Sequence, residues 1–125
     1  MTVASSSVAR ALERGHRIDI TTTGRHSGLP RRIELVFHNV DGRILISGKP
    51  GWPRSWIANL SANPEMTFHL KGPIAVSDLP ARGRVITDLA ERREVLAPIA
   101  AAWGYPIETM VTGSPLIEVT FPDGV

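Results

Sequence analysis

Three arginines and a histidine lie within the twelve residues from Thr21 to Arg32, whose sequence is TTTGRHSGLPRR. The stretch contains no acidic residue that could neutralise them. Its Gly-x-x-Ser-Gly turn, residues 24–28, can direct backbone N–H groups and a hydroxyl at one point, and guanidinium groups bind phosphate or carboxylate oxygens through paired hydrogen bonds. These residue types at this spacing predict a loop that binds an anion. A solvated hairpin loop is the alternative interpretation, because runs of like charge are often plain surface.

A second basic segment, SGKPGWPR, supports the anion-binding interpretation. Lys49 directly follows a predicted strand, and Arg54 lies at the head of a predicted helix, where the positive end of the helix dipole attracts anions. Residues 1–64 carry nine Arg or Lys and four Asp or Glu, whereas residues 65–125 carry five and eight, so the net charges are +5 and −3. This asymmetry indicates an anionic ligand bound by the first half of the chain. It falls short of the broad basic stripe expected for duplex nucleic acid, which we do not expect as a partner.

Composition bounds the class of protein. The 125 residues are 42% hydrophobic and 21% charged, as in one globular domain over residues 1–125. No apolar run reaches the roughly 18 residues of a membrane helix, and the N-terminus lacks the apolar core of a signal peptide. We therefore expect a cytoplasmic protein without an integral membrane segment, which is compatible with peripheral membrane contact. The chain has no cysteine, and the lone strand histidines His38 and His69 are not expected to bind a metal.

The elements that must position the basic residues follow from hydrophobic periodicity and turn signals. We predict a first helix over Ser5–Gly15, with serines capping its start, followed by antiparallel strands over Arg17–Thr23, Arg31–Val40 and Arg43–Gly48. The pair Asp41-Gly42 favours a tight hairpin between the second and third strands, because glycine readily adopts positive φ and aspartate tolerates it better than most residues.

The second half of the chain adds helices between strands. Ser55 should cap a short helix that ends before Pro64, and Asp88 and Glu91 have capping-box spacing at the start of a helix that Pro98 should kink or shorten. The predicted elements are strands over Glu65–Gly72 and Ala81–Asp88, a helix over Asp88–Trp103 and a last strand over Ser114–Phe121. Early hairpins followed by inserted helices predict a mainly β, α+β protein built on a small antiparallel barrel.

Two motifs stand in order along the chain, with Lys49 between them. The first, Thr-x-Gly-Arg-x-Ser-Gly-x-Pro-Arg, runs from Thr22 to Arg31, and the second, Trp-x-x-Asn-Leu-x-Ala-Asn-Pro, runs from Trp56 to Pro64. Together they resemble the deazaflavin-dependent nitroreductase family, also described as deazaflavin-dependent quinone reductases, over nearly the whole chain. The resemblance implies a split β-barrel of about six antiparallel strands, related to the FMN-binding barrel of pyridoxamine phosphate oxidases. It also implies a reductase that transfers a hydride from reduced coenzyme F420 to an electron-poor acceptor such as a quinone, enone or nitro compound.

The same resemblance implies roles for individual residues. Coenzyme F420 joins a flat deazaflavin ring to a ribityl chain, a phosphodiester and a lactyl-oligoglutamate tail, so one part of it is polyanionic. Trp56 and Asn59 would shape the site near that part. Ser47 or Tyr105 is the candidate proton donor to the acceptor, although solvent can serve. The implied cofactor-binding residues are Arg25, Ser27, Gly28, Pro30, Arg31, Arg32, Lys49, Arg54, Trp56 and Asn59.

The chain departs from the best-known family members in several places, and Tyr105 is its only tyrosine where other members have several aromatic residues lining the acceptor pocket. The loop after Lys49 looks shorter, and Arg32-Ile33-Glu34 stand where small residues usually follow the first motif. A small-molecule acceptor is expected as the partner, and both a monomer and a homodimer fit the sequence. Two alternative functions stay open: a split-barrel protein that binds FMN or haem, and a non-catalytic binder of an apolar ligand such as a fatty acid.

Overall fold

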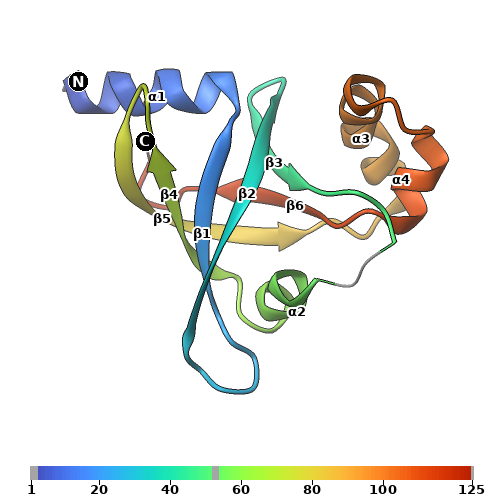
Figure 1. Ribbon diagram of the computed structural model, residues 1–125, viewed down its shortest axis with the longest axis horizontal. Coiled ribbons are helices and arrows are strands. Elements are labelled where there is room, and N and C mark those ends of the chain that lie inside the picture. Colours follow the sequence, from blue (N-terminus) through green and yellow to red (C-terminus); the bar gives the residue numbers. More distant parts are fainter. Residues whose placement is uncertain (1–2, 52–53, 125) are drawn as a thin grey trace.

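The protein is described by a computed structural model that covers residues 3–51 and 54–124. This part of the chain folds into six β-strands and four α-helices (Figure 1). They are α1 (Val3–Arg14), β1 (Arg17–Thr23), β2 (Pro30–Val40), β3 (Arg43–Ser47), α2 (Ser55–Ala62), β4 (Glu65–Lys71), β5 (Val76–Val85), α3 (Leu89–Trp103), α4 (Ile107–Gly113) and β6 (Leu116–Thr120). The strands close into a barrel in the order β1-β2-β3-β6-β5-β4, and each neighbouring pair is antiparallel. The predicted antiparallel barrel is therefore confirmed.

The predicted hairpin between β2 and β3 is also confirmed. Asp41 and Gly42 have φ angles of 53° and 86°, and Val40 pairs with Arg43 across the turn. Positive φ at both central residues is the geometry whose twist matches that of the flanking strands.

Alternating residues of the strands fill the barrel. In β1, Ile18, Ile20 and Thr22 are buried, and the residues between them are more exposed. Phe37 of β2 and Phe68 of β4 meet inside the barrel with ring centroids 5.3 Å apart. This packing holds the register of β1, because a slip of one residue would turn every buried side chain to the outer face.

The prediction for β5 was wrong at both ends. The strand begins at Val76 rather than Ala81 and continues through Pro80. Gly83 N donates to the carbonyl oxygen of Pro64 at 2.9 Å, so the backbone groups of Gly83 point toward the β4 side of the strand. Backbone groups alternate in direction along a strand, so those of Pro80, three residues earlier, point toward the β6 side. Pairing with β6 starts only at Arg82, so the N–H that proline lacks is not needed for the sheet.

Several helix boundaries also differ from the prediction. α1 begins at Val3, so its serines lie inside the helix rather than capping it. Arg54, not Ser55, occupies the N-cap position of α2. α3 continues through Pro98 to Trp103 and is not shortened, and α4 was not predicted.

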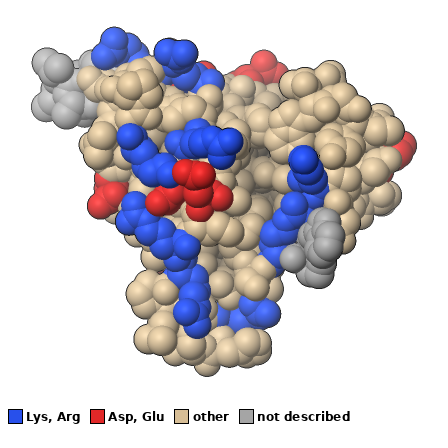
Figure 2. All heavy atoms as spheres, in the orientation of Figure 1, with Lys and Arg blue, Asp and Glu red and all other residues tan. Residues whose placement is uncertain are grey.

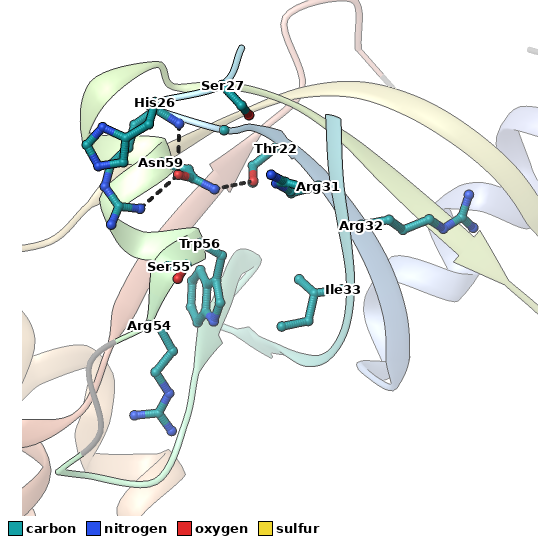
Figure 3. Close-up of a pocket in the computed structure, with 12 residues that line it drawn as sticks. Thr22, His26, Ser27, Arg31, Arg32, Ile33, Arg54, Ser55, Trp56 and Asn59 are labelled. Carbon is teal, nitrogen blue, oxygen red and sulfur yellow. Dashed lines mark hydrogen bonds between the residues drawn. The ribbon is translucent and has the colours of Figure 1, made fainter. Parts of the chain in front are cut away.

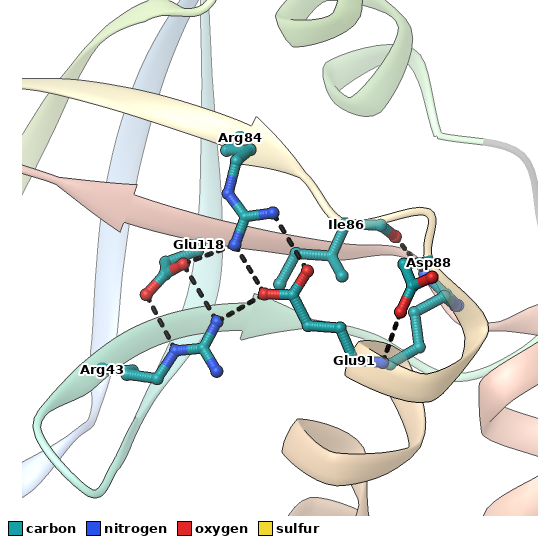
Figure 4. Close-up of polar contacts among 7 residues, drawn as sticks. Arg43, Arg84, Ile86, Asp88, Glu91 and Glu118 are labelled. Carbon is teal, nitrogen blue, oxygen red and sulfur yellow. Dashed lines mark hydrogen bonds and ion pairs between the residues drawn. The ribbon is translucent and has the colours of Figure 1, made fainter.

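The N-cap of α3 was predicted correctly. The Asp88 side chain accepts a hydrogen bond from Glu91 N at 2.9 Å. Glu91 also joins a ring of ion pairs on the outer face of the barrel with Arg43 of β3, Arg84 of β5 and Glu118 of β6 (Figure 4). Hydrogen bonds from Arg84 and Arg43 lower the pKa of Glu91 to about 2. This ring ties α3 to three strands through charges that neutralise one another.

The hairpin of β1 and β2 projects beyond the barrel beside α2 (Figure 1). β1 pairs with β2 as far as Thr23 and Pro30, but its pairing with β4 ends at Thr21. On the other side, β2 pairs with β3 only from Phe37 onward. The barrel is thus split beside the end of the hairpin, and this end carries the first basic motif.

Candidate functional site

The tip of the β1–β2 hairpin is a tight loop whose shape depends on two glycines. Gly24 N donates to the carbonyl oxygen of Leu29 at 2.8 Å, and Gly28, with a φ of 71°, donates to the carbonyl oxygen of Gly24 at 2.8 Å. The Ser27 hydroxyl oxygen accepts from Leu29 N at 3.1 Å. A Cβ on Gly24 would lie 2.6 Å from that hydroxyl oxygen. The loop therefore folds back on its own serine, which leaves the hydroxyl proton available for a ligand.

Asn59 attaches this loop to α2. Its side-chain oxygen accepts from both the backbone N–H and the guanidinium Nη1 of Arg25, each at 3.1 Å. Its amide nitrogen donates to the Thr22 hydroxyl at 3.2 Å (Figure 3). Asn59 and Thr22 are only 4% and 2% exposed. The amide thus fixes the start of the loop and the direction of Arg25 at the same time.

A cavity of about 630 Å³ lies between the hairpin and α2. Its lining combines four arginines, a histidine, hydroxyl groups and two large apolar side chains, with no Asp or Glu among the lining residues that the structure describes. The lining residues are Thr22, Gly24, Arg25, His26, Ser27, Arg31, Arg32, Ile33, Arg54, Ser55, Trp56 and Asn59. On the face that Figure 2 shows, Lys and Arg side chains flank a hollow beside the hairpin. A cavity of this composition attracts an anion that also has an apolar part.

Strand alternation divides the two neighbouring arginines of β2. Arg31 and Ile33 lie on the same face of the strand as the buried Phe37. Arg32 points away from the cavity in Figure 3, and its Nε donates to Asp19 Oδ2 at 2.8 Å on the outer face. Hydrogen bonds from Lys71 and Arg32 lower the pKa of Asp19. The charge of Arg32 is therefore compensated, whereas Arg31 has no acidic partner among the described residues.

The cavity also has an apolar side. The Trp56 indole, 4% exposed, and the Ile33 side chain, 39% exposed, lie on opposite sides of the cavity in Figure 3. Trp56 belongs to the barrel core, which fixes its position, whereas Ile33 lies on the projecting part of β2. A flat apolar ring fits between these two side chains better than a flexible or fully charged group.

The remaining predicted residues lie around this cavity without lining it. Gly28 and Pro30 belong to the hairpin end, whose shape they help to set. Lys49 lines a neighbouring hollow of about 380 Å³ together with Trp103, Gly104 and Tyr105. Ser47 is buried, and its hydroxyl donates to the carbonyl oxygen of Pro115 at 2.6 Å. The structure thus brings Lys49 and Tyr105 together and separates them from the arginines of the hairpin.

Arg54 lies between the two hollows. It lines the larger cavity, and its guanidinium packs so closely against Gly48 that a Cβ there would lie 2.9 Å from Nη2. Gly48 directly precedes Lys49, which lines the smaller hollow. The absence of a side chain at Gly48 therefore gives the Arg54 guanidinium room at this position.

Five lining residues are absent from the predicted cofactor-binding set: Thr22, Gly24, His26, Ile33 and Ser55. Alternation along β2 was a usable signal for Ile33, because it shares a strand face with Arg31. Thr22, Gly24 and His26 belong to the hairpin end that carries the first motif, but nothing in the sequence places Ser55 against the hairpin, since that contact depends on how α2 packs. None of the helices in the described part of the chain has the length and apolar character needed to cross a bilayer.

The fold and the cavity define a split-barrel protein with a cationic site for a partly apolar anion. Residues 2–116 match the family model described as F420H(2)-dependent quinone reductase, so the chain belongs to that family. The protein is accordingly an oxidoreductase that uses coenzyme F420.

Solved structures share this fold at low sequence identity. An F420-H2 dependent reductase is 21% identical, with a TM-score of 0.58 over 83% of this chain and 93% of that chain. A FAD-binding protein from Mesorhizobium loti is 14% identical, with a TM-score of 0.62 over 97% and 91%. A Clostridium acetobutylicum protein of the pyridoxinephosphate oxidase family, related to general stress protein 26, is 14% identical, with a TM-score of 0.67 over 93% and 82%. The predicted split barrel related to pyridoxamine phosphate oxidases is thus confirmed.

The chemistry of the cavity fits coenzyme F420. Arg31, which has no acidic partner among the described residues, and the Ser27 hydroxyl proton supply donors for phosphate or carboxylate oxygens. Trp56 and Ile33 supply an apolar slot for a flat ring. Both halves of the cofactor therefore find matching surfaces in one cavity.

Proposed function

We propose that the protein transfers a hydride from reduced coenzyme F420 to an electron-poor organic acceptor, namely a quinone, an enone or a nitro compound. The observation that carries this proposal is the cavity itself, in which Arg25 and Arg31 stand beside the slot between Trp56 and Ile33, with no Asp or Glu among the described lining residues. When bound, the reduced deazaflavin supplies the hydride, and the protein supplies binding, orientation and exclusion of competing reactions.

The basic side of the cavity has the task of anchoring. Arg25 is oriented by Asn59, and Arg31 projects from β2 toward the same space (Figure 3). Two guanidinium groups fixed on different elements hold a phosphate in one place and one orientation. Salt should weaken this binding, since both arginines are exposed to solvent.

The apolar side of the cavity has the task of holding the ring and excluding water. Hydride transfer requires donor and acceptor atoms held about 3–3.5 Å apart, so a displaced ring lowers turnover even when the anion stays bound. Trp56 is fixed by the barrel core and can hold one face of a ring. We therefore expect Trp56→Ala to lower turnover more than it lowers affinity.

The proton that the acceptor needs has three candidate sources. Tyr105 lines the second hollow, together with Lys49. The Ser47 hydroxyl is engaged by Pro115, and solvent can also deliver the proton. Tyr105→Phe separates these sources, because it removes a proton donor and keeps the ring.

Two adjacent arginines provide a matched pair of variants for the anchoring role. Arg31→Ala should weaken binding of coenzyme F420 by about 1–3 kcal/mol, the range for loss of a charge-assisted hydrogen bond. Arg32→Ala removes the same charge from the other face of β2, where it is paired with Asp19. The affinity for coenzyme F420 should therefore stay nearly unchanged, with only a small loss of long-range attraction for the anion. Fluorescence titration of coenzyme F420 measures both, and equal affinities in the two variants would contradict the proposed cavity.

Turnover tests the chemical step. The assay follows the oxidation of reduced coenzyme F420 by the protein with quinones, enones and nitroaromatics tested in turn. For direct hydride transfer, we expect stereospecific transfer of deuterium from labelled cofactor to product. Tight cofactor binding without turnover on the whole panel would favour a carrier. Binding of FMN, haem or a fatty acid in place of coenzyme F420 would favour the alternative functions.

A further inference from the structure

One stretch of β2 has an unpaired edge beside the cavity. Residues 30–36 of β2 pair with β1, but pairing with β3 begins only at Phe37. Among the described strands, this stretch therefore has a neighbour on one side only. The free edge of a strand presents backbone N–H and C=O groups that can pair with another molecule.

The hydrogen bonding of the β1–β2 ladder shows which groups face this edge. Phe37 N donates to the carbonyl oxygen of His16 at 3.1 Å, in line with the register of the two strands. In an antiparallel ladder, residues bonded to the partner alternate with residues whose backbone groups point the other way. Ile33 therefore directs its N–H and C=O toward β1, and Arg32 and Glu34 direct theirs to the free edge.

Arg32 brings its backbone groups into the cavity wall. The residue lines the cavity, yet its guanidinium leaves the cavity and binds Asp19 on the outer face. Because the side chain turns to the outer face, we infer that the main chain is the part of Arg32 that borders the cavity. Ile33 comes next in β2, and Trp56 lies across the cavity (Figure 3). A donor and an acceptor thus stand at the side of the apolar slot.

We propose that the main-chain N–H and C=O of Arg32 bind the polar edge of a planar heterocycle held between Ile33 and Trp56. The matching ligand edge carries a carbonyl oxygen next to an N–H, as an amide or imide does. The pyrimidine part of the deazaflavin ring has such an edge. The inference rests on the proposed function and adds to it the group that orients the ring within the slot.

A second copy of the chain is the competing occupant of this edge, because strand edges also pair with one another. Self-pairing through the free edge of β2 would bring the Arg31 side chains of both copies to one interface. Like charges brought together across strands oppose such pairing. The free edge also lies beside the cavity rather than on an open face, so a small ligand suits it better.

Amide hydrogen exchange of the wild-type protein, followed by NMR, tests the proposal directly. The Arg32 amide should exchange quickly in the free protein and at least about tenfold more slowly when coenzyme F420 is saturating, because a hydrogen-bonded amide must open before it exchanges. The Ile33 amide, bonded to β1, should be protected in both states. Unchanged exchange at Arg32 under saturation would overturn the proposal, and so would protection that rises with protein concentration without ligand. Failure of coenzyme F420 to bind at all would instead refute the proposed function.

A pair of variants at position 32 gives an independent measurement. Arg32→Pro removes the N–H that the ladder does not use, whereas Arg32→Ala removes the same side chain and keeps that N–H. Arg32→Pro should bind coenzyme F420 about tenfold more weakly than Arg32→Ala, as expected for one lost hydrogen bond. Equal affinities would contradict the proposal.

A modified ligand decides the question if Arg32→Pro does not fold. Methylation of the ring nitrogen between the two carbonyl groups of the deazaflavin removes the ligand's donor without changing the protein. The methylated ring compound should bind the wild-type protein about tenfold more weakly than its parent. An unchanged affinity would overturn the assignment of the Arg32 carbonyl as its acceptor.

Discussion

Replacement of Asn59 by alanine should both destabilise the protein and weaken cofactor binding. The change removes three hydrogen bonds, two from Arg25 and one to the Thr22 hydroxyl, at a position that is 4% exposed. A neutral hydrogen bond contributes about 1 kcal/mol and one to a charged group about 1.5–3 kcal/mol, with the low end expected for the exposed Arg25. We therefore expect the free energy of unfolding to fall by about 3 kcal/mol.

Asn59→Asp separates the two effects. An aspartate oxygen still accepts from Arg25, and the Thr22 hydroxyl can donate to the second oxygen, so most of the stability should remain. Its charge, however, compensates Arg25 and should weaken binding of coenzyme F420 about tenfold. Thr22→Val is the matched control, because it removes only the hydrogen bond from the Asn59 amide and should cost about 1 kcal/mol of stability.

Urea unfolding and fluorescence titration of coenzyme F420 measure the two quantities on the same samples. The reasoning fails if Asn59→Ala unfolds at the same urea concentration as the wild type, since the loop would then not depend on α2. It also fails if Asn59→Asp binds coenzyme F420 as well as the wild type does, since Arg25 would then have no part in holding the anion.

Three further predictions concern the loop, the outer ion pairs and the strand histidine. Gly24→Ala should weaken cofactor binding by about 1 kcal/mol in a titration, because its Cβ displaces the Ser27 hydroxyl, and it should change the unfolding temperature little. Hydrogen bonds, first of all from Arg84, lower the pKa of Glu91 to about 2 in the folded protein. The ionised Glu91 therefore contributes its full stabilisation above its ordinary pKa of 4.5, and this stabilisation is lost as the pH falls toward 2. Thermal unfolding between pH 6 and pH 2 should show this loss, and Glu91→Gln should reduce it. His69→Ala should lower stability by about 2 kcal/mol, because it removes two hydrogen bonds across strands, and should leave turnover nearly unchanged; a large loss of turnover would give this histidine an unexpected role.

The barrel was predictable from local signals along the chain. β-Branched residues in β1, alternation in β2 and β4, and the Asp41-Gly42 turn indicated antiparallel strands, and all of these are present. The limits of β5 were not predictable in the same way. Pro80 is normally excluded from a paired strand, and it is accepted here because β6 ends before reaching it.

The site was predictable in its chemistry but not in its geometry. The basic composition of the stretch from Thr21 to Arg32, without an acidic residue, already predicted an anion-binding loop. Neighbouring arginines look equivalent in the sequence, yet Arg31 faces the cavity and Arg32 binds Asp19 on the outer face. Lys49, which sequence reasoning grouped with the arginines, lines a separate hollow.

The sequence by itself determined the residue types that bind an anion, the alternation that builds the strands and the turns that join them, because these depend on neighbours within a few positions. The tertiary structure alone decided that Asn59 of α2 fixes Arg25, that Trp56 faces Ile33 across the cavity and that β2 keeps an unpaired edge there. Each of these depends on packing between segments that are some 20 to 35 positions apart, or on where a neighbouring strand ends. Local periodicity contains no information about such contacts, because they arise only when the barrel closes.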